Sequence, residues 1–261
     1  MTLKLKYRAY TGFLYMFLFL IFITGGAQAE NTQYPVKNTV IIDPFNKLHI
    51  RGDVYIAYAW GEHLTFPYRF TRGLFNLKNA VAKWTEITLR FDKHVLLSSE
   101  RLLDMPFMFV TTDDMFELTE TEKINVQNYF KNGGFMVLEN SSPKHDFSMA
   151  EATLKKMIRD TIPNARFAII PDNHPLYHCF FDFDDGPPYG AEIGRFGPYL
   201  SQQRYYLEGV WYKNRLVAIY SNKGYIIKWS ETTNNEPQLR MGVNMLVFAL
   251  TQKGGIAHTN N

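Results

Sequence analysis

The chain has 261 residues, of which 46% are hydrophobic, 16% aromatic and 20% charged, a composition typical of a globular protein with one or two domains. Lys and Arg number 28, against 25 Asp and Glu, but Lys4, Lys6 and Arg8 all lie in the first 29 residues. Without that segment the basic and acidic residues are equal at 25 each. This balance argues against a protein that binds nucleic acid or an acidic membrane surface through its net charge.

Residues 1–29 have the pattern of a secretory signal peptide. The basic start is followed by the apolar run Ala9–Thr24, and Ala27-Gln28-Ala29 has the small-x-small spacing that signal peptidase accepts. The sequence predicts export to the periplasm with cleavage after Ala29. The alternative is an uncleaved inner-membrane anchor, because the apolar run approaches the length of a spanning helix.

Cys179 is the chain's single cysteine, so an exported form has no intrachain disulfide and depends on its core. It lies in the apolar segment Leu176–Phe181, beside aromatic residues. This setting predicts a buried structural thiol, and we expect Cys179→Ser to keep function with a small loss of stability.

The first elements after the leader are an extended arm, a strand, a helix and a strand. Their predicted ranges are 30–50, Asp53–Trp60, Arg72–Trp84 and Ile87–Phe91.

The aromatic residues of the first predicted strand allow two interpretations. Tyr58 and Trp60, with Arg69 nearby, could line a groove for a sugar or peptide at the carboxyl end of that strand. The alternative is that the aromatic rings belong to the core.

The stretch Met105–Asn140 holds a complete strand, helix, strand unit. Pro106–Thr112 is the first strand, and Thr119 with Glu122 forms a capping box that begins the helix. Asn132-Gly133-Gly134 ends the helix, and Phe135–Leu138 is the second strand. Such a unit predicts two parallel neighbours joined by a right-handed crossover.

The remaining elements complete a single domain over residues 51–254, with a polar tail at 255–261. They are a helix from Met149 to Ile162 capped by Asp146 or Ser148, a strand at Phe167–Ile170, a long loop over Asp182–Ser201, a β-hairpin of Tyr205–Tyr212 and Arg215–Tyr220 with a Lys213-Asn214 turn, and a last helix from about Pro237.

Polar residues follow both strands of the central unit. Asp113 and Asp114 come directly after the first, and Glu139 and Asn140 follow the apolar run of the second. Because parallel strands have their carboxyl ends at one edge, we expect these four residues to line a binding crevice there as exposed loop-edge groups. Paired carboxylates in it would suit an acid and base or a cation. The alternative is that they are turn and cap residues.

His174 and His178, followed by Asp182, have the four-residue spacing of a metal site on one helix face, and we expect either histidine to reach into the crevice. The alternative is that His174 or Asn173 caps a short helix and His178 packs at its end, since Pro175 suits only a first turn. Ser141 and Ser142 are candidate nucleophiles, with loop residues as the alternative. Overall the sequence predicts neither a metal nor a cofactor, and no catalytic residue is assigned.

The chain resembles the domain-of-unknown-function family 4159. The segments that carry the resemblance are PFMFVTTDDMFELTETE, YFKNGGFMVLEN, NHPLYHCFFDF, GVWYKNRLVAIYS and NNEPQLRMGVNMLVFAL. The resemblance implies an exported or membrane-tethered bacterial protein with a fold related to class I glutamine amidotransferases. It therefore implies an α/β fold, a three-layer α/β/α sandwich with a mostly parallel, flavodoxin-like sheet plus the C-terminal β-hairpin. Gene neighbourhoods of the family, with AAA ATPases and von Willebrand type A proteins, imply a role in assembly of the cell envelope.

Amidotransferase chemistry requires a nucleophilic cysteine on a sharp turn after a strand. After Phe135–Leu138 the chain instead has Glu139-Asn140-Ser141-Ser142, so the sequence predicts no glutaminase activity. We expect a non-catalytic binding or assembly module of the envelope, whose partner is an envelope protein or a small polar or carbohydrate ligand. The alternative is a carboxylate-dependent hydrolase or carbohydrate-active enzyme.

Overall fold

The computed structural model describes residues 39–143, 148–193 and 206–257, without the side chains of residues 39, 92, 93 and 193. The predicted leader, the first part of the predicted arm and much of the predicted long loop lie outside these ranges. Within them, no helix combines the length and the apolar character that crossing a membrane requires.

The described residues form one mixed sheet of eight strands. The strands are β1 (Thr39–Asp43), β2 (Asn46–Trp60), β3 (Glu86–Leu96), β4 (Phe107–Thr112), β5 (Phe135–Asn140), β6 (Arg166–Ile169), β7 (Glu208–Tyr212) and β8 (Arg215–Ser221). Their order is β1-β2-β4-β5-β8-β7-β6, with β3 also paired to β2. The central pairs β2–β3, β2–β4, β4–β5 and β5–β8 are parallel, whereas β1–β2, β6–β7 and β7–β8 are antiparallel. The prediction of an α/β fold with a mostly parallel sheet is confirmed.

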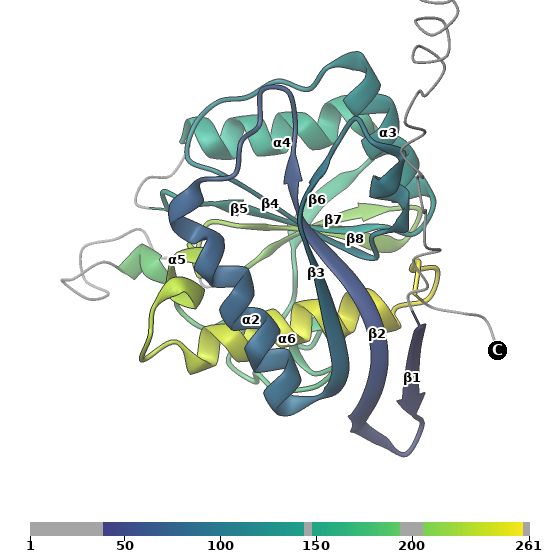
Figure 1. Cartoon of the computed structure of the whole chain (residues 1–261), viewed down its shortest axis with the longest axis vertical. Helices are drawn as coiled ribbons and strands as arrows, with labels where there is room; N and C mark the ends of the chain where they lie inside the picture. The colour runs from purple at the N-terminus through teal and green to yellow at the C-terminus, as the bar shows by residue number, and fades with distance from the viewer. Residues whose placement is uncertain (1–38, 144–147, 194–205, 258–261) are drawn as a thin grey trace, which may run out of the picture. The chain divides into compact units, whose positions relative to one another are not determined.

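The helices divide between two hydrophobic clusters. They are α2 (Thr71–Trp84), α3 (Glu120–Lys131), α4 (Met149–Thr161), α5 (Tyr225–Ser230) and α6 (Glu236–Thr251). Leu74 of α2, Trp229 of α5 and Leu246 of α6 belong to one cluster. Val126 of α3 and Leu154 of α4 belong to the other. Figure 1 shows α2 and α6 on one side of the strands and α3 and α4 on the other.

The capping box at the start of α3 is formed as predicted. The hydroxyl of Thr119 accepts from the backbone N–H of Glu122 at 3.3 Å, and Glu122 Oε2 accepts from the backbone N–H of Thr119 at 2.9 Å. Glu122 Oε1 also accepts from the backbone N–H of Glu62 at 2.8 Å. The cap therefore holds the loop that follows β2 against the start of α3.

The hairpin of β7 and β8 turns at the two predicted residues. Lys213 and Asn214 both have positive φ, 50° and 61°. Two successive left-handed residues are typical of a type I′ turn, whose twist matches that of the flanking strands. This prediction is confirmed.

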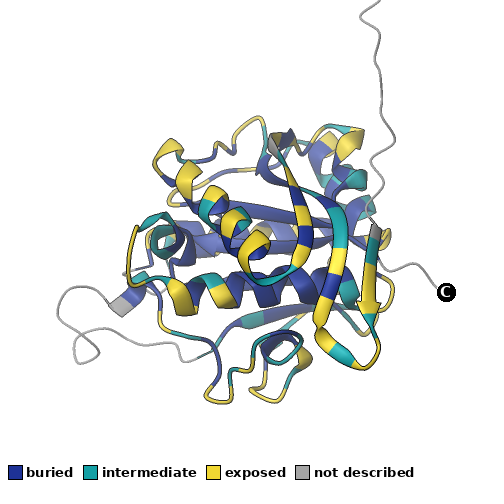
Figure 2. Ribbon diagram, turned by 60° about the horizontal axis from the view of Figure 1, so that its bottom comes forward, coloured by how far each residue is buried: buried dark blue, intermediate teal, exposed yellow. Residues whose placement is uncertain are grey.

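The structure differs from the sequence-based elements at the start of the domain. Residues Thr39–Asp53, which overlap the predicted extended arm, form an antiparallel hairpin in which Ile42 pairs with Ile50. β2 is therefore longer than the predicted strand Asp53–Trp60. Figure 2 shows exposed residues along this hairpin and a buried sheet at the centre of the domain. The sequence did carry a signal for it, because polar and apolar residues alternate from Lys47 to Arg51, as in a strand with one buried face.

Helix α5 has no counterpart among the predicted elements. It has only six residues, too few for an apolar period to be recognised. Its N-cap, Gly224, has φ 64°, and a Cβ there would lie 2.7 Å from Pro143 Cγ. Glycine therefore allows the chain to turn from β8 into this helix within the crowded carboxyl edge.

Candidate functional site

The sheet has a topological switch point between β2 and β4. β2 connects through α2 to β3, and β4 connects through α3 to β5. Since α2 and α3 belong to different hydrophobic clusters, the two connections leave on opposite sides of the sheet. A crevice is expected outside the carboxyl ends of two such strands.

A hollow of about 580 Å³ lies at this point, and we call it the switch hollow. It is lined by the loop after β2 and the loop after β4: His63, Thr65, Pro67, Tyr68, Arg69, Thr112, Asp113, Asp114 and Met115. Two of the predicted site residues, Asp113 and Asp114, therefore lie together in it.

The carboxylates of the switch hollow have defined partners. Arg69 forms an ion pair with Asp113 across the hollow, between partly exposed side chains. Asp114 Oδ1 accepts from the backbone N–H of Met115 at 2.7 Å, and its backbone N–H donates to the hydroxyl of Thr112 at 3.1 Å. The loop after β4 is thus ordered by its own aspartate and threonine. The hollow presents both signs of charge on a fixed backbone.

A second, more apolar hollow of about 450 Å³ adjoins the first, and we call it the methionine hollow. Met115 and Met149 on its walls are 63% and 59% exposed. Exposed methionines of this kind are typical of adaptable protein-binding surfaces. Its lining is His63, Met115, Phe116, Glu117, Met149, Ala152, Thr153 and Lys156, so His63 and Met115 belong to both hollows. The two hollows therefore lie side by side, one mainly polar and one mainly apolar.

Glu139 does not line either hollow. It has no exposed surface, and its two oxygens accept from the backbone N–H groups of Gly224 at 3.0 Å and Tyr225 at 2.9 Å. Burial raises the pKa of Glu139 to about 8, although these hydrogen bonds oppose the rise. The expectation that it is an exposed loop-edge carboxylate is wrong, because the start of α5 encloses it.

Asn140 is also fully buried, and its amide joins three elements. Its Nδ2 donates to Ser148 Oγ at 3.0 Å and to Asn222 Oδ1 at 2.6 Å. Its Oδ1 accepts from the backbone N–H of Ser142 at 2.9 Å, and the backbone N–H of Ser141 donates to Thr112 O. Asn140 thus has a structural role, because its side chain links three segments of the chain. Ser141 and Ser142 lie in the turn that it stabilises.

The structure places His174 and His178 away from the switch hollow. His174 Nδ1 accepts from the backbone N–H of Leu176 at 3.1 Å, and its ring packs on Trp211 and Phe248, so it caps a 3₁₀ turn as the alternative interpretation expects. Burial lowers the pKa of His174.

His178 Nδ1 lies 3.3 Å from Asp182 Oδ1, and its Nε2 lies 2.9 Å from the carbonyl oxygen of Asp172. Lys47, near the amino end of β2, also binds Asp182. Among the described residues, no three His, Cys, Asp or Glu side chains are grouped to hold a metal ion.

A family model with the description "Domain of unknown function (DUF4159)" matches residues 55–250, from within β2 to α6. The chain belongs to the DUF4159 family. No curated protein matches it.

The thiol of this DUF4159 domain is unsuited to nucleophilic attack. Cys179 Sγ lies 3.3 Å from the carbonyl oxygen of Asn244 and 3.8 Å from that of Leu176. Burial raises the pKa of Cys179 to about 12. A thiol that stays protonated in water near neutral pH is a weak nucleophile.

The sequence reasoning about the DUF4159 domain did not identify the pair Lys223–Glu192. Lys223 Nζ lies 3.0 Å from Glu192 Oε1, and both side chains are almost fully buried at the carboxyl end of β8. Burial raises the pKa of Glu192, while Lys223 opposes the rise. Gly190 allows this contact, since a Cβ there would lie 2.1 Å from Lys223 O. No local pattern indicates a pair formed between two loops.

His63 also escaped sequence reasoning, although it borders both hollows. A position in the loop that ends the first strand is the signal that could have found it. The groove suggested for Tyr58, Trp60 and Arg69 has a different outcome for two of these residues. Tyr58 is buried and stacks on Phe66. Arg69 lines the switch hollow.

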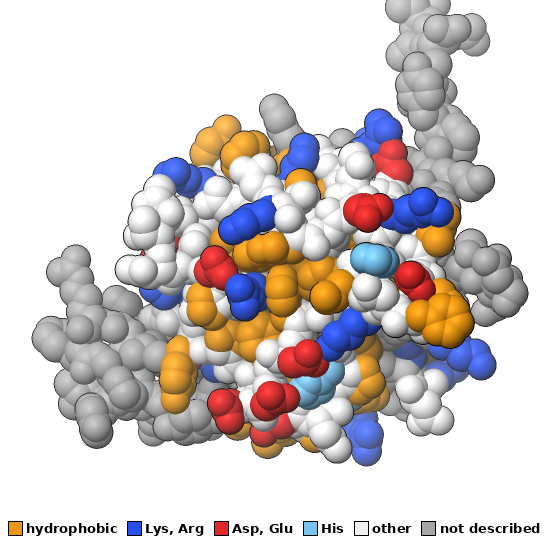
Figure 3. Space-filling model, turned by 90° about the horizontal axis from the view of Figure 1, so that it is seen from below, with side chains coloured by type: hydrophobic (Ala, Val, Ile, Leu, Met, Phe, Trp, Pro, Cys, Tyr) orange, Lys and Arg blue, Asp and Glu red, His pale blue; other side chains and the backbone are white. Residues whose placement is uncertain are grey.

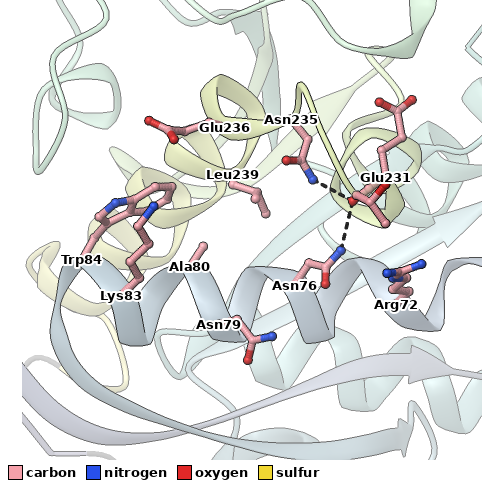
Figure 4. Close-up of a pocket in the computed structure, with 11 residues that line it drawn as sticks. Arg72, Asn76, Asn79, Ala80, Lys83, Trp84, Glu231, Asn235, Glu236 and Leu239 are labelled. Atoms are coloured by element: carbon pink, nitrogen blue, oxygen red, sulfur yellow. Dashed lines mark hydrogen bonds between the residues drawn. The ribbon is translucent and has the colours of Figure 1, made fainter.

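A third hollow of about 330 Å³ lies between α2 and the α5–α6 connection (Figure 4). The amides of Asn76 and Asn235 both donate to the carbonyl oxygen of Glu231, at 3.3 and 2.9 Å, and Asn76 also donates to that of Trp229 at 2.6 Å. These hydrogen bonds join α2 to the end of α5. The amides of Asn76 and Asn235 are therefore already used by the fold, and we assign no ligand to this hollow.

Proposed function

We propose that this chain is an exported, non-catalytic binding module of the cell envelope, which holds a segment of a partner protein in the adjoining switch and methionine hollows. Export is supported by the leader pattern of residues 1–29. The assembly role and a three-layer, amidotransferase-like architecture are supported by the resemblance and by helices in two separate hydrophobic clusters.

The observation that carries the proposal is that a polar hollow and an apolar hollow lie side by side at the switch point. The switch hollow offers Arg69 and Asp113, which suit the polar groups of a peptide. The methionine hollow offers Met115 and Met149, which suit an apolar side chain. An extended peptide presents such side chains a few residues apart, so it can fill both hollows together.

A carboxylate-dependent enzyme receives less support from the same geometry. Acid–base chemistry needs two carboxyl groups that face one ligand. Glu139 is enclosed beneath α5, and Asp113 is paired with Arg69. Asp114 holds its own loop through Met115 N–H.

Photocrosslinking in the native host tests this proposal. A photoreactive phenylalanine analogue at Met115 should give one protein adduct of defined mass, identified by mass spectrometry. The same analogue at Phe75, which is 56% exposed on α2 and lines neither hollow, is the matched control. Replacing Arg69 by Asp should weaken the Met115 adduct about tenfold, as expected for loss of a central contact.

Two results would contradict the proposal. One is an identical set of adducts at Met115 and Phe75. The other is full complementation of a gene deletion by a chain that carries both Arg69→Asp and Met115→Asp and folds normally. Turnover of a small molecule that depends on Asp113 would instead favour the enzyme.

A further inference from the structure

A fourth hollow, of about 590 Å³, lies at the amino ends of β5 and β8, on the opposite edge of the sheet from the switch hollow. The end of α3, the turn between β7 and β8 and the end of α6 supply most of its lining. That lining holds four cations and no Asp or Glu, which gives it a formal charge of +4. We call it the basic hollow after these cations, Lys131, Lys213, Arg215 and Lys253.

One sign of charge is gathered in the basic hollow although the chain as a whole is balanced. Residues 30–261 contain 25 basic and 25 acidic residues. Over the face that Figure 3 shows, basic side chains lie among acidic ones. The switch hollow likewise pairs Arg69 with Asp113. A hollow lined by cations without carboxylates is therefore a local feature, which the net charge does not predict.

None of the four cations forms an ion pair with a carboxylate among the residues that the structure describes. Lys131 Nζ donates to Gln127 Oε1 at 2.7 Å, and Lys213 Nζ lies 5.3 Å from the ring centre of Tyr212. An amide oxygen and a ring face compensate a positive charge less than a carboxylate does. The charges of the basic hollow are therefore open to a ligand.

Arg215 is half-buried, and the fold uses part of its guanidinium. Nη1 donates to the carbonyl oxygens of Gly133 and Gly134, both at 3.1 Å, and Nη2 donates to that of Phe130 at 2.7 Å. A guanidinium has five N–H groups, so at least two of them have no acceptor within the described ranges. Burial lowers the pKa of Arg215, because it removes water from a charge that no carboxylate compensates.

The wall of the basic hollow contains a second donor that the fold leaves over. Gln252 Nε2 is enclosed and has no hydrogen-bond partner in the described part of the chain. A buried donor without an acceptor costs free energy. Oxygen atoms of a ligand would supply acceptors to this wall, so the hydrogen-bond donors and the positive charge favour the same kind of occupant, an oxyanion.

Compensation of helix dipoles explains only part of the charge. Lysine is favoured at the carboxyl end of a helix, and Lys131 is the last residue of α3 while Lys253 follows α6. Each helix end carries roughly −0.5 of a charge, so two ends amount to about −1 against four cations. Lys213 lies in the turn between two strands, away from either helix end in sequence. About three positive charges therefore remain without a counterpart.

Aromatic side chains form the less polar part of the lining. The ring of His174 packs against those of Trp211 and Phe248, with ring centres 6.4 and 5.3 Å apart. Trp211 and Tyr212 are half-buried, so part of each ring is left for a ligand. Since burial lowers the pKa of His174, the imidazole adds no further positive charge near neutral pH.

We propose that the basic hollow binds a ligand that carries a phosphate group, either a soluble phosphate ester or the headgroup of a lipid. A phosphate monoester carries close to two negative charges and several acceptor oxygens, so it matches the excess charge and the free N–H groups better than one carboxylate does. Arg and Lys are the side chains with which proteins bind phosphate. The volume leaves room for more than the phosphate, and the aromatic lining suits the less polar remainder of the ligand.

Isothermal titration calorimetry of the protein purified from its host, with inorganic pyrophosphate as the probe, tests the proposal. We expect one site with a dissociation constant in the micromolar to millimolar range, and weaker binding as salt screens the charges. Lys131→Glu should weaken binding at least about tenfold, because it reverses one of the four charges. Lys213→Glu, in an exposed turn, should do the same.

Lys83→Glu is the matched control. Lys83, like Lys131, is an exposed lysine in the last turn of a helix, but it does not line the basic hollow. Both variants lose the same interaction with a helix end, so their thermal midpoints should fall by similar small amounts. Lys83→Glu should nevertheless bind pyrophosphate as the unchanged protein does.

Vesicles distinguish the two sources of phosphate. The protein is sedimented with vesicles of phosphatidylcholine alone and with vesicles that also contain phosphatidic acid. Sedimentation only with the second, abolished by Lys131→Glu, would assign the site to a lipid headgroup. Pyrophosphate binding without sedimentation would assign it to a soluble phosphate ester.

Three results would overturn the proposal. One is the absence of both pyrophosphate binding and sedimentation with phosphatidic acid. Another is an equal loss of binding in Lys131→Glu and Lys83→Glu, which would reflect the net charge of the protein. The third is tighter binding of the tricarboxylate citrate than of pyrophosphate. Since none of the replaced lysines lines the switch or methionine hollow, these results do not bear on the proposed partner site.

Discussion

Glu139, the residue before the last of β5, lies inside the domain, where it accepts two backbone hydrogen bonds from the start of α5. Its carboxyl group joins two segments that are 85 residues apart, Glu139 and Gly224. Because burial raises its pKa to about 8, from the ordinary 4.5, this residue couples folding to pH.

The contribution of Glu139 to the stability of the protein should therefore fall as the pH rises. The folded pKa of Glu139 lies above the unfolded one, so its contribution is fully present below about pH 4.5 and is lost as the pH rises through about 8. Between these values we expect the free energy of unfolding to fall by on the order of 1 kcal/mol per pH unit relative to Glu139→Gln. Denaturant titrations of both proteins at several pH values measure it. Parallel pH profiles would contradict this assignment.

Asp113 should contribute little to stability despite its place in the site. Its ion pair with Arg69 joins partly exposed side chains, and such pairs contribute about 0–1 kcal/mol. Asp113→Ala should leave the thermal midpoint nearly unchanged and weaken partner capture at Met115. Calorimetry and the crosslinking assay provide the two readouts. Unfolding without loss of capture per folded molecule would make Asp113 a structural residue.

Cys179 should be unreactive and replaceable. Burial raises its thiol pKa to about 12, so alkylation of the native protein at pH 8 should be much slower than that of the unfolded chain. Cys179→Ser should lower stability slightly and leave function intact. Mass spectrometry after timed alkylation measures the first effect, and complementation of a deletion measures the second.

At the scale of elements, the capping residues at the start of α3 also hold a loop that borders the site. Thr119 and Glu122 cap the helix, and the same Glu122 holds the backbone of Glu62 in the loop beside the switch hollow. One helix start therefore serves both folding and the shape of the site.

The two cap residues should differ in their effects. Thr119→Ala should cost about 1 kcal/mol, the usual effect of losing a cap. Glu122→Ala should cost more, because it also leaves the backbone N–H of Glu62 without its acceptor. Hydrogen exchange should show faster exchange at Glu62 in Glu122→Ala than in Thr119→Ala. Equal exchange rates at Glu62 in the two variants would show that Glu122 does not hold this loop.

At the scale of the whole molecule, the sheet brings distant loops to one edge. The loop after β2 and the loop after β4 meet there and form the switch hollow. The β1–β2 hairpin is fixed near the amino end of β2 through Lys47 and Asp182. The proposed partner site and this hairpin therefore lie at opposite ends of β2.

Export is the prediction that concerns the whole chain. The basic start, the apolar run Ala9–Thr24 and Ala27-Gln28-Ala29 predict a mature protein that begins at Glu30. Mass spectrometry of the protein from periplasmic extracts measures its N-terminus. A membrane-bound chain that keeps residues 1–29 would establish an anchor.

Local signals in the sequence determined the elements that depend on few neighbours. Thr119 and Glu122 lie three residues apart and predicted the start of α3, and Lys213-Asn214 predicted the turn between β7 and β8. Parallel pairing of β4 and β5 followed from a short crossover, and it indicated that Asp113 lies at the carboxyl edge of the sheet. The cap and the turn join groups that are close in sequence, so propensity and spacing carry the information. The strand pairing followed instead from the rule for a short crossover connection.

Only the tertiary structure decided which polar groups are exposed. Glu139 and Asp113 both follow apolar runs, yet α5 buries one and leaves the other beside His63 in the switch hollow. Lys223 and Glu192 pair across 31 residues. The physical reason is that burial and charge pairing depend on which segments pack together, and hydrophobic packing acts over the whole chain without a local pattern.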